Sequence, residues 1–505
     1  GISAGKNLAA GIVTATTFYG DGSNLTGAGS TAFIRQSVTA QSGTTTINLN
    51  DGNIIYLTHS NNTTIAFSNV KTADDVTIIR TLTDNTITWP TGVTWNGGSA
   101  PTLIGANSYS LTGQSFNLVT ADGGTTWYGY EEVNNDNAQP YKLFSLGGKN
   151  NAGALGQNTS NPAQLSSPVQ VGSDATWLNM GSTGVGDGFD NGLAVKSDGT
   201  LWTWGYNANG HLGHNNTTSY SSPTQVGSDT TWAFGDIGSG GVKTDGTLWM
   251  WGNNGDGELG LNDRTKRSSP TQIPGTTWST DQKSFSYGSA FTVAIKTDGT
   301  MWSWGSNRYG KLGINQPHLT KLSSPTQVPG TNWDSVDTGG STCFATKTDG
   351  TLWSWGSGGG DGDLGHNNKS NYSSPTQIPG TTWANGYQKV TAHGQGGACI
   401  RTDGTLWTWG NNGQGELGLN NTTEYSSPKQ VPGTTWRTVQ GGQDSMMATK
   451  TDGTLWAWGS NTYGSFGQNN RTNESSPKQI PGTDWGQQMG IIGGAGKNFF
   501  GTKIP

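Results

Sequence analysis

The decapeptide KTDGTLWSWG at residues 347–356 is the stretch from which the rest of the chain can be understood. Close copies of it begin at residues 196, 243, 296, 401 and 450. Each copy predicts a β-hairpin, because alternating residues lead into Asp-Gly, whose glycine tolerates the positive φ of a tight turn. The return strand carries tryptophans at positions i and i+2, so both indoles leave one face of the sheet. Six copies, roughly fifty residues apart, indicate a repeat architecture.

Counting the other pieces of the repeat shows that one hairpin is missing. The return strand occurs seven times, starting at Leu143, and so does a Ser-Ser-Pro block, with prolines at 168, 223, 270, 325, 375, 428 and 477. An isolated tryptophan also occurs seven times, at 177, 232, 278, 333, 383, 436 and 485. The missing hairpin falls where residues 499–503 would meet residues 141–147, as expected of a ring closed by both termini, which leaves few long edges.

Four short strands can be assigned to each unit, and seven units predict a seven-bladed β-propeller. In the fourth full copy we expect the strands at 324–328, 333–336, 343–347 and 351–356 to form one unit. We also expect the Trp-x-Trp pairs to pack between neighbouring blades.

Composition supports an all-β chain and argues against several classes of function. Among 505 residues there are 81 glycines and 22 tryptophans, and only 12% are charged. The net charge is −6, with no basic stripe of the kind that nucleic-acid binding requires. No run of 18 apolar residues predicts membrane insertion, and no secretory signal is visible.

Because the sequence begins at Gly1, we expect its start to be processed, trimmed or incompletely known. Cys343 and Cys399 are expected to be free, packed thiols, although a disulfide stays open.

The N-terminal part divides into three further regions. Residues 1–30 are small and glycine-rich, cannot bury a core alone, and are assigned as an attachment segment that needs a partner chain or a larger body. Residues 31–132 predict a small β-sandwich, because seven candidate strands are separated by Asn, Asp and Gly turns: 44–48, 54–58, 64–67, 75–82, 86–89, 116–120 and 126–130. Residues 133–140 are a polar linker, and residues 141–505 form the predicted propeller.

Two family resemblances follow from these motifs. The block F-x-x-A-x-K-T-D-G-T-L-W-S-W-G-x-N-x-x-G-x-L-G, followed by Ser-Ser-Pro, resembles the regulator-of-chromosome-condensation repeat family over about 365 residues. This resemblance implies a seven-bladed propeller closed by both termini. The family includes a nuclear guanine-nucleotide exchange factor, but the basic arm that this activity needs is absent here, so exchange activity is not expected.

The second resemblance lies before the propeller. GIVTATTFYGDGSNLTG (residues 11–27) and ITWPTGVTWNGGSAPTL (residues 87–103) resemble segments of marine tailed-phage structural and tail-fibre proteins. It implies a virion protein at the particle surface, a fibre, whisker or other appendage of the capsid or neck. Its partners would be other virion proteins and a host glycan or outer-membrane protein, and fibre assembly suggests a homotrimer. A bacterial surface or secreted adhesin is the alternative, and a glycan depolymerase is a further one.

The residues that could carry chemistry fit structural roles better. The six histidines are not at metal-ligand spacing, and we expect them to be solvent-facing loop residues. Asp256-Gly-Glu258 and Asp361-Gly-Asp363 look like calcium-loop fragments, but the closing glutamate is absent. The repeated Lys-Thr-Asp-Gly serves one hairpin role six times. We therefore predict no enzyme activity, no catalytic residue, no metal and no cofactor.

Recognition residues are instead expected in seven loops that vary around a constant scaffold. The variable positions flank the middle glycine of each loop, as in Tyr309 and Lys311. Loops on a rigid scaffold commonly carry binding residues, and pseudosymmetry should place these seven on one face. The predicted ligand contacts for a glycan or a protein are Tyr206, Arg308, Tyr309 and Tyr463.

Overall fold

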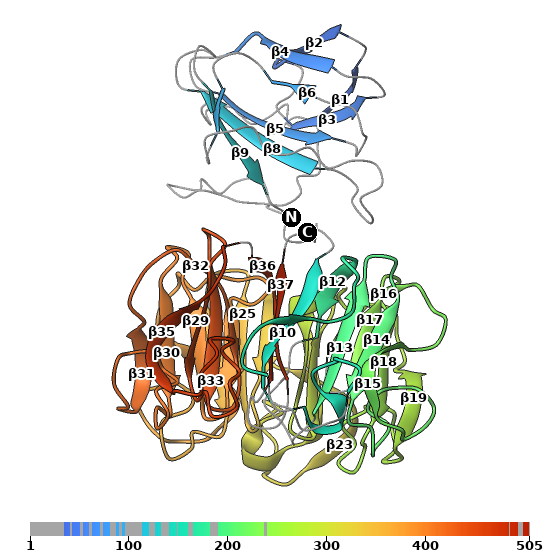
Figure 1. Cartoon of the computed structure of the whole chain (residues 1–505), viewed down its shortest axis with the longest axis vertical. Coiled ribbons are helices and arrows are strands. Elements are labelled where there is room, and N and C mark those ends of the chain that lie inside the picture. The colour runs from blue at the N-terminus through green and yellow to red at the C-terminus, as the bar shows by residue number, and fades with distance from the viewer. Residues whose placement is uncertain are drawn as a thin grey trace, which may run out of the picture. The chain divides into compact units, whose positions relative to one another are not determined.

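A computed structural model gives the fold of the chain (Figure 1). The residues that it describes are 35–40, 43–50, 54–59, 63–70, 74–80, 87–89, 93–95, 114–120, 127–132, 141–148, 150–159, 165–181, 190–236, 240–483, 485–492 and 498–503. The chain divides into two compact units, Gly1–Asn137 and Ala138–Pro505. The predicted attachment segment and linker lie outside the described residues.

The N-terminal unit contains two β-sheets. Its strands are β1 (Arg35–Ala40), β2 (Gly43–Asn48), β3 (Ile54–His59), β4 (Thr63–Ser68), β5 (Asp74–Arg80), β6 (Ile87–Thr88), β7 (Val93–Trp95), β8 (Gln114–Thr120) and β9 (Trp127–Glu132). One sheet has the order β1-β3-β5-β8-β9-β7 and the other β2-β4-β6. Seven of these strands match the predicted ones, whereas β1 and β7 were not predicted.

Successive strands at the start of this unit alternate between the two sheets. As a result β1, β3 and β5 pair in parallel, and so do β2, β4 and β6. Strands β5, β8 and β9 then pair antiparallel. Ile47 and Ile65 from one sheet share a buried core with Ile55, Val76 and Leu118 from the other. The predicted two-sheet sandwich is therefore present, with largely parallel pairing.

The C-terminal unit is a seven-bladed β-propeller, and each blade is a sheet of four strands. Blades 1 to 3 contain β12 (Trp177–Met180), β13 (Asn191–Lys196), β14 (Leu201–Gly205) and β15 (Tyr220–Gln225); β16 (Trp232–Asp236), β17 (Gly240–Lys243), β18 (Leu248–Gly252) and β19 (Arg267–Gln272); and β20 (Phe285–Gly288), β21 (Phe291–Ile295), β22 (Met301–Ser306) and β23 (Lys321–Val328).

Blades 4 to 6 contain β24 (Trp333–Thr338), β25 (Thr342–Lys347), β26 (Leu352–Gly356) and β27 (Tyr372–Ile378); β28 (Val390–His393), β29 (Gly396–Ile400), β30 (Leu406–Gly410) and β31 (Tyr425–Gln430); and β32 (Trp436–Gly441), β33 (Ser445–Lys450), β34 (Leu455–Gly459) and β35 (Glu474–Ile480). Blade 7 contains β36 (Trp485–Ile492), β37 (Asn498–Lys503), β10 (Lys142–Gly147) and β11 (Val169–Gln170). Short 3-10 turns are η1 (Asn151–Gly153), η2 (Gln282–Ser284) and η3 (Arg308–Gly310).

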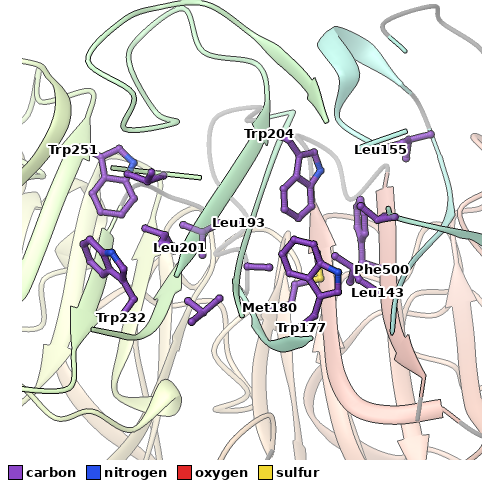
Figure 2. Close-up of a cluster of buried hydrophobic side chains, with 14 residues drawn as sticks. Leu143, Leu155, Trp177, Met180, Leu193, Leu201, Trp204, Trp232, Trp251 and Phe500 are labelled. Carbon is purple, nitrogen blue, oxygen red and sulfur yellow. The ribbon is translucent and has the colours of Figure 1, made fainter. Parts of the chain in front are cut away.

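Blade 7 closes the ring with strands from both ends of the propeller, as the sequence predicted. Strand β10 pairs antiparallel with β37, in a register that sets Leu143 opposite Thr502. Figure 2 shows Phe500 and Leu143 of this blade beside Trp204 and Trp177 of blade 1. The ring centres of Phe500 and Trp204 are 6.0 Å apart, so aromatic side chains pack the boundary between blades 7 and 1.

The sequence repeat is offset from the blade by one strand, which corrects the predicted unit. Residues 324–328 belong to β23, which pairs with β22 in blade 3, whereas the next three predicted strands lie in blade 4. The first strands of neighbouring blades contact each other around the axis, so the Ser-Ser-Pro strand is the outermost. Hydrophobic spacing alone does not show which strand neighbours which.

The two tryptophans of each Trp-x-Trp pair have different partners. The indole N–H of Trp355 donates to the carbonyl of Lys311 in the preceding blade at 3.0 Å, so this residue packs between blades as predicted. Trp353 instead packs within its own blade, with its ring 6.0 Å from that of Trp333. The prediction is therefore confirmed for the second tryptophan, while the first packs on the isolated tryptophan of its own blade.

The Lys-Thr-Asp-Gly segment is a structural part of the hairpin. In blade 4 the Lys347 ammonium lies 4.6 Å from the ring centres of both Trp333 and Trp353. The Trp353 indole donates to the Thr351 hydroxyl (2.8 Å), and that hydroxyl donates to Asp349 (2.6 Å). A cation over an indole face is favourable, and the same sandwich recurs with the basic residues 196, 243, 296, 401 and 450.

Candidate recognition face

The variable loops lie on the propeller face opposite the Asp-Gly turns. In blades 1 to 6 the Asp-Gly turn joins the second and third strands, and in all seven blades the variable loop joins the third and fourth strands at their other end. Tyr141, at the start of the propeller chain, forms a bridge with Trp177 on the Asp-Gly side. The variable loops therefore form a face, called the loop face below, away from the point where the chain enters the propeller.

A buried asparagine organises most of these loops. In blade 2 the Asn254 side-chain oxygen accepts the backbone N–H of Leu259 at 3.0 Å. Its amide donates to the carbonyls of Asp263 and Thr265, both at 3.1 Å. Equivalent asparagines at 150, 207, 307, 412 and 461 accept the same backbone hydrogen bond. Because both ends of each loop are tied to one side chain, the loops are rigid supports for the residues at their tips.

A second asparagine in each loop joins neighbouring blades, and our sequence analysis missed it. Asn262 has φ 60°, and its backbone N–H donates to the Ser323 carbonyl of the next blade at 2.6 Å. The same bond, 2.6–2.8 Å long, occurs at all seven boundaries, through asparagines 158, 215, 262, 315, 367, 420 and 469. The signal was present as Gly-x-x-Gly-x-Asn in all seven loops. Asparagine is the non-glycine residue that most readily adopts this left-handed conformation.

The second variable position of each loop is buried, contrary to our expectation of surface contacts. Ala154, His211, Glu258, Lys311, Asp363, Glu416 and Ser465 occupy it, and none is more than 4% exposed. In six of them the backbone carbonyl accepts an indole N–H from the next blade. Burial raises the pKa of Asp363 and of Glu416 to about 7 and lowers that of His211 to about 4. Variation here tunes the packing at blade boundaries.

The predicted contact residues lie on three blades of the loop face. Tyr206 of blade 1 is 42% exposed. Arg308 and Tyr309 are neighbours in η3 of blade 3, where Arg308 is exposed and Tyr309 is half-buried. Tyr463, on blade 6, is half-buried. The fold thus brings only Arg308 and Tyr309 together, whereas Tyr206 lies two blades away from them and two blades away from Tyr463 around the ring.

Blade 3 carries features that its sequence did not single out. Tyr309 adopts φ 63°, and Leu319 adopts φ 74° while 65% exposed. A left-handed non-glycine residue costs on the order of 1–3 kcal/mol, and such strain tends to occur at functional sites. The ring of His318 lies 5.5 Å from that of Tyr309 and its Nδ1 accepts the Tyr309 backbone N–H at 2.9 Å. These contacts hold the strained segment in one arrangement.

Charge is unevenly distributed over the loop face. Blades 2 and 3 expose Arg264, Lys266, Arg308 and Lys321. Their half-buried acidic residues Asp256 and Asp263 form ion pairs with Lys321 and Arg267. The loops of blades 4 to 6 carry Asp361, Glu424, Asp444 and Glu474, with Lys369 and Arg471 as their exposed cations. The face therefore has a basic half and an acidic half, although the whole chain has a net charge of −6.

A small polar cavity of about 30 Å³ lies among the inner strands, lined by Asp236, Lys283, Asp337, Tyr387 and Gln440 together with their neighbours. Asp337 accepts hydrogen bonds from Ser286 and from the backbone N–H of Ala392, which ties blades 3, 4 and 5 together. Burial nevertheless raises its pKa to about 6. This volume suits one or two water molecules rather than a sugar or a nucleotide.

The structure also tests the predictions for the cysteines and the histidines. Cys343 and Cys399 are free and buried, as expected. His211 and His393 are buried, so the prediction of solvent-facing histidines is wrong for these two. Within the described ranges, no group of three His, Cys, Asp or Glu side chains could hold a metal ion, and no helix is long and apolar enough to cross a membrane.

Comparison with known protein families identifies the repeats of the propeller. The regulator of chromosome condensation (RCC1) repeat matches residues 198–241, 245–295, 298–346, 403–449 and 452–486, and a second RCC1 repeat description matches residues 283–311. The propeller is built from RCC1 repeats. Each matched segment begins close to an Asp-Gly turn, so the RCC1 repeat is offset from the structural blade in the same way as the repeat that we identified.

Curated relatives contain RCC1-like sequence in proteins of different kinds. Human "E3 ubiquitin-protein ligase HERC2" is 26% identical over 260 residues, which cover 49% of this chain and 5% of that protein. Arabidopsis thaliana "RCC1 domain-containing protein RUG3, mitochondrial" is 32% identical over 241 residues, covering 45% of this chain and 53% of that protein. The chain thus spans a small part of the first and about half of the second.

Solved structures share the fold of the RCC1 repeats. Yeast RCC1 (Prp20), solved in a complex with Kap60, superposes with a TM-score of 0.60 at 17% identity, covering 72% of this chain and 90% of that chain. Human WBSCR16 gives a TM-score of 0.58 at 18% identity, covering 72% and 98%. At these identities the likeness concerns the fold alone.

Proposed function

We propose that this chain is a non-catalytic recognition protein and that its propeller binds through the loop face. The observation that carries the proposal is the contrast between constant and variable positions. The Asn, Gly and Trp residues that hold each loop recur around the ring, whereas the loop tips differ in charge and aromatic character. Rigid scaffolds that present variable loops are commonly used for binding.

The biological setting that we propose is the surface of a tailed-phage particle. This part rests on the resemblance of residues 11–27 and 87–103 to phage structural and fibre segments. The chain would be a tail fibre, whisker or capsid or neck appendage, with other virion proteins as one set of partners and a host glycan or outer-membrane protein as the other. Residues 1–30 would attach it, in keeping with a homotrimeric fibre. Mass spectrometry of purified particles tests this setting, and absence of the chain from particles would contradict it.

The non-catalytic part of the proposal is supported by the hydrogen bonds of two carboxyl groups on the loop face. Glu258 and Glu416 each accept backbone N–H groups of their own loops, at 2.7 Å, and so stabilise the loops. Some relatives are named as ubiquitin ligases, but the chain covers a small part of them. Incubating the full chain with host polysaccharide and measuring new reducing ends tests depolymerase activity. New ends released in proportion to protein would refute this part of the proposal.

Binding itself is tested with labelled full-length chain and host cells. We expect saturable binding that unlabelled chain competes away, and no saturable binding would refute the recognition function. The same chain anchored on a bacterial surface would be an adhesin, which is the second candidate. Sequencing upstream of Gly1 separates the two, since an adhesin needs an export signal.

A further inference from the structure

The exposed cations of blades 2 and 3 lie on the same loops and the same face as the exposed tyrosine of blade 1 and the strained tyrosine of blade 3. The Lys266 ammonium of blade 2 donates to the Asn209 side chain of blade 1 at 2.7 Å. Lys321, at the start of the outer strand of blade 3, forms an ion pair with Asp256 of blade 2. These contacts link the loops of blades 1, 2 and 3. We call this set of residues the anion track and define it as Tyr206, Arg264, Lys266, Lys321, Arg308 and Tyr309.

The guanidinium of Arg308 is preorganised for an anionic ligand. It lies 4.9 Å from the ring centre of Tyr309, which in turn is held by His318. Among the described residues Arg308 forms no ion pair, so its planar donor fork is not engaged by a carboxylate of the protein. A guanidinium in this state matches the two oxygens of a carboxylate or a sulfate.

The loop that carries His318 adds an apolar contact beside the cations. Pro325 follows Gly313 by 12 positions, whereas the corresponding proline follows its glycine by 10 positions in blades 1, 2, 4, 5 and 6. The longer loop includes Leu319, which is 65% exposed. Leu319 directly follows His318, whose ring lies 5.5 Å from that of Tyr309. An exposed leucine at this place can pack against the C–H face of a sugar ring while the cations bind its charged group.

We propose that the anion track binds a linear anionic polysaccharide through its carboxylate or sulfate groups. This inference rests on the proposed recognition function and gives that function a ligand class and a place. An anionic ligand is favoured because the exposed cations gather on the loops of blades 2 and 3, whereas the loops of blades 4 to 6 are acidic. A linear polymer can follow these successive loops without covering the acidic half of the face.

The test compares two charge reversals on the full-length chain. Arg308→Glu alters the track, and Arg471→Glu is the matched control because Arg471 is an exposed arginine on the acidic half of the same face. The probes are polygalacturonate for carboxylate, dextran sulfate for sulfate, and neutral dextran. Affinity electrophoresis gives the dissociation constants, and thermal unfolding followed by fluorescence confirms that both variants are folded.

We expect at least one charged polymer, but not neutral dextran, to bind, and Arg308→Glu to weaken that binding about tenfold or more. Arg471→Glu should change it by less than about twofold. The preferred polymer identifies the anion. Equal losses in the two variants, or equal binding of neutral dextran, would overturn the assignment.

Failure of this inference can be told apart from failure of the proposed function. If the chain binds host cells, and Arg308→Glu binds them as well as the wild type does, the site is wrong and the recognition function stands. If both charged polymers fail while a host protein is bound, the polysaccharide class is wrong. If neither cells nor polymers are bound, both proposals fall.

Discussion

The second glycine of each variable loop offers a quantitative test of how the blades are packed together. Gly313 has φ 70°, and a Cβ atom built on it would lie 2.6 Å from Nε1 of Trp355 in the next blade. Gly172 has φ 67°, and a Cβ atom there meets nothing within 4 Å. The variants Gly313→Ala and Gly172→Ala should therefore have nearly equal backbone strain. Only Gly313→Ala adds a clash with a neighbouring side chain.

The expected difference can be worked out from these two environments. A left-handed alanine costs about 1–2 kcal/mol, and the restricted unfolded chain returns about 0.4–1 kcal/mol. Gly172→Ala should therefore lower the free energy of unfolding by about 0–1.5 kcal/mol. Gly313→Ala also displaces the Trp355 indole, which adds about 1–3 kcal/mol for overpacking and about 1 kcal/mol for its hydrogen bond to Lys311.

Guanidinium unfolding followed by tryptophan fluorescence measures this difference, because 19 of the 22 tryptophans lie after residue 140. We expect Gly313→Ala to be less stable than Gly172→Ala by about 2–4 kcal/mol. Equal stability of the two variants, to within about 0.5 kcal/mol, would refute the claim that this glycine is required by the close approach of Trp355.

Three further predictions concern the loops and the closure. Burial raises the pKa values of Asp363 and Glu416 to about 7, so these carboxyl groups bind protons more tightly in the folded chain than in the unfolded chain. We therefore expect the free energy of unfolding to rise as pH falls from about 8 to about 6.5. Denaturant titrations measure this dependence, and the double variant Asp363→Asn with Glu416→Gln should flatten it. Asn262→Ala should cost about 1 kcal/mol relative to Asn262→Gly, because the left-handed backbone that donates to Ser323 suits glycine; thermal unfolding at matched pH measures it. A chain that ends before β37 (Asn498–Lys503) should lose cooperative unfolding and associate through the exposed strand edges. Size-exclusion chromatography detects this association, with a chain that ends at residue 503 as the control. An unchanged monomer peak would contradict the closure of the ring.

The candidate site was less accessible to sequence reasoning than the fold was. Variation around constant glycines located the loops, and that signal correctly separated scaffold from tips. It could not show that Lys311 and its six equivalents point into blade boundaries, because burial depends on where the next blade packs. It also could not show that Arg308 stacks on Tyr309, or that Leu319 is exposed in a longer loop. These features arise from backbone dihedral angles and from contacts between loops.

The sequence by itself determined the number of blades, the hairpin in six of them and the closure by both termini. All three follow from local patterns that repeat: Asp-Gly at the turn, tryptophans two apart, and one hairpin fewer than the number of return strands. Only the tertiary structure decided which strand lies innermost, which of two tryptophans crosses a blade boundary and which variable residues are exposed. Those outcomes depend on packing between segments that lie tens of residues apart, and local periodicity carries no information about such contacts.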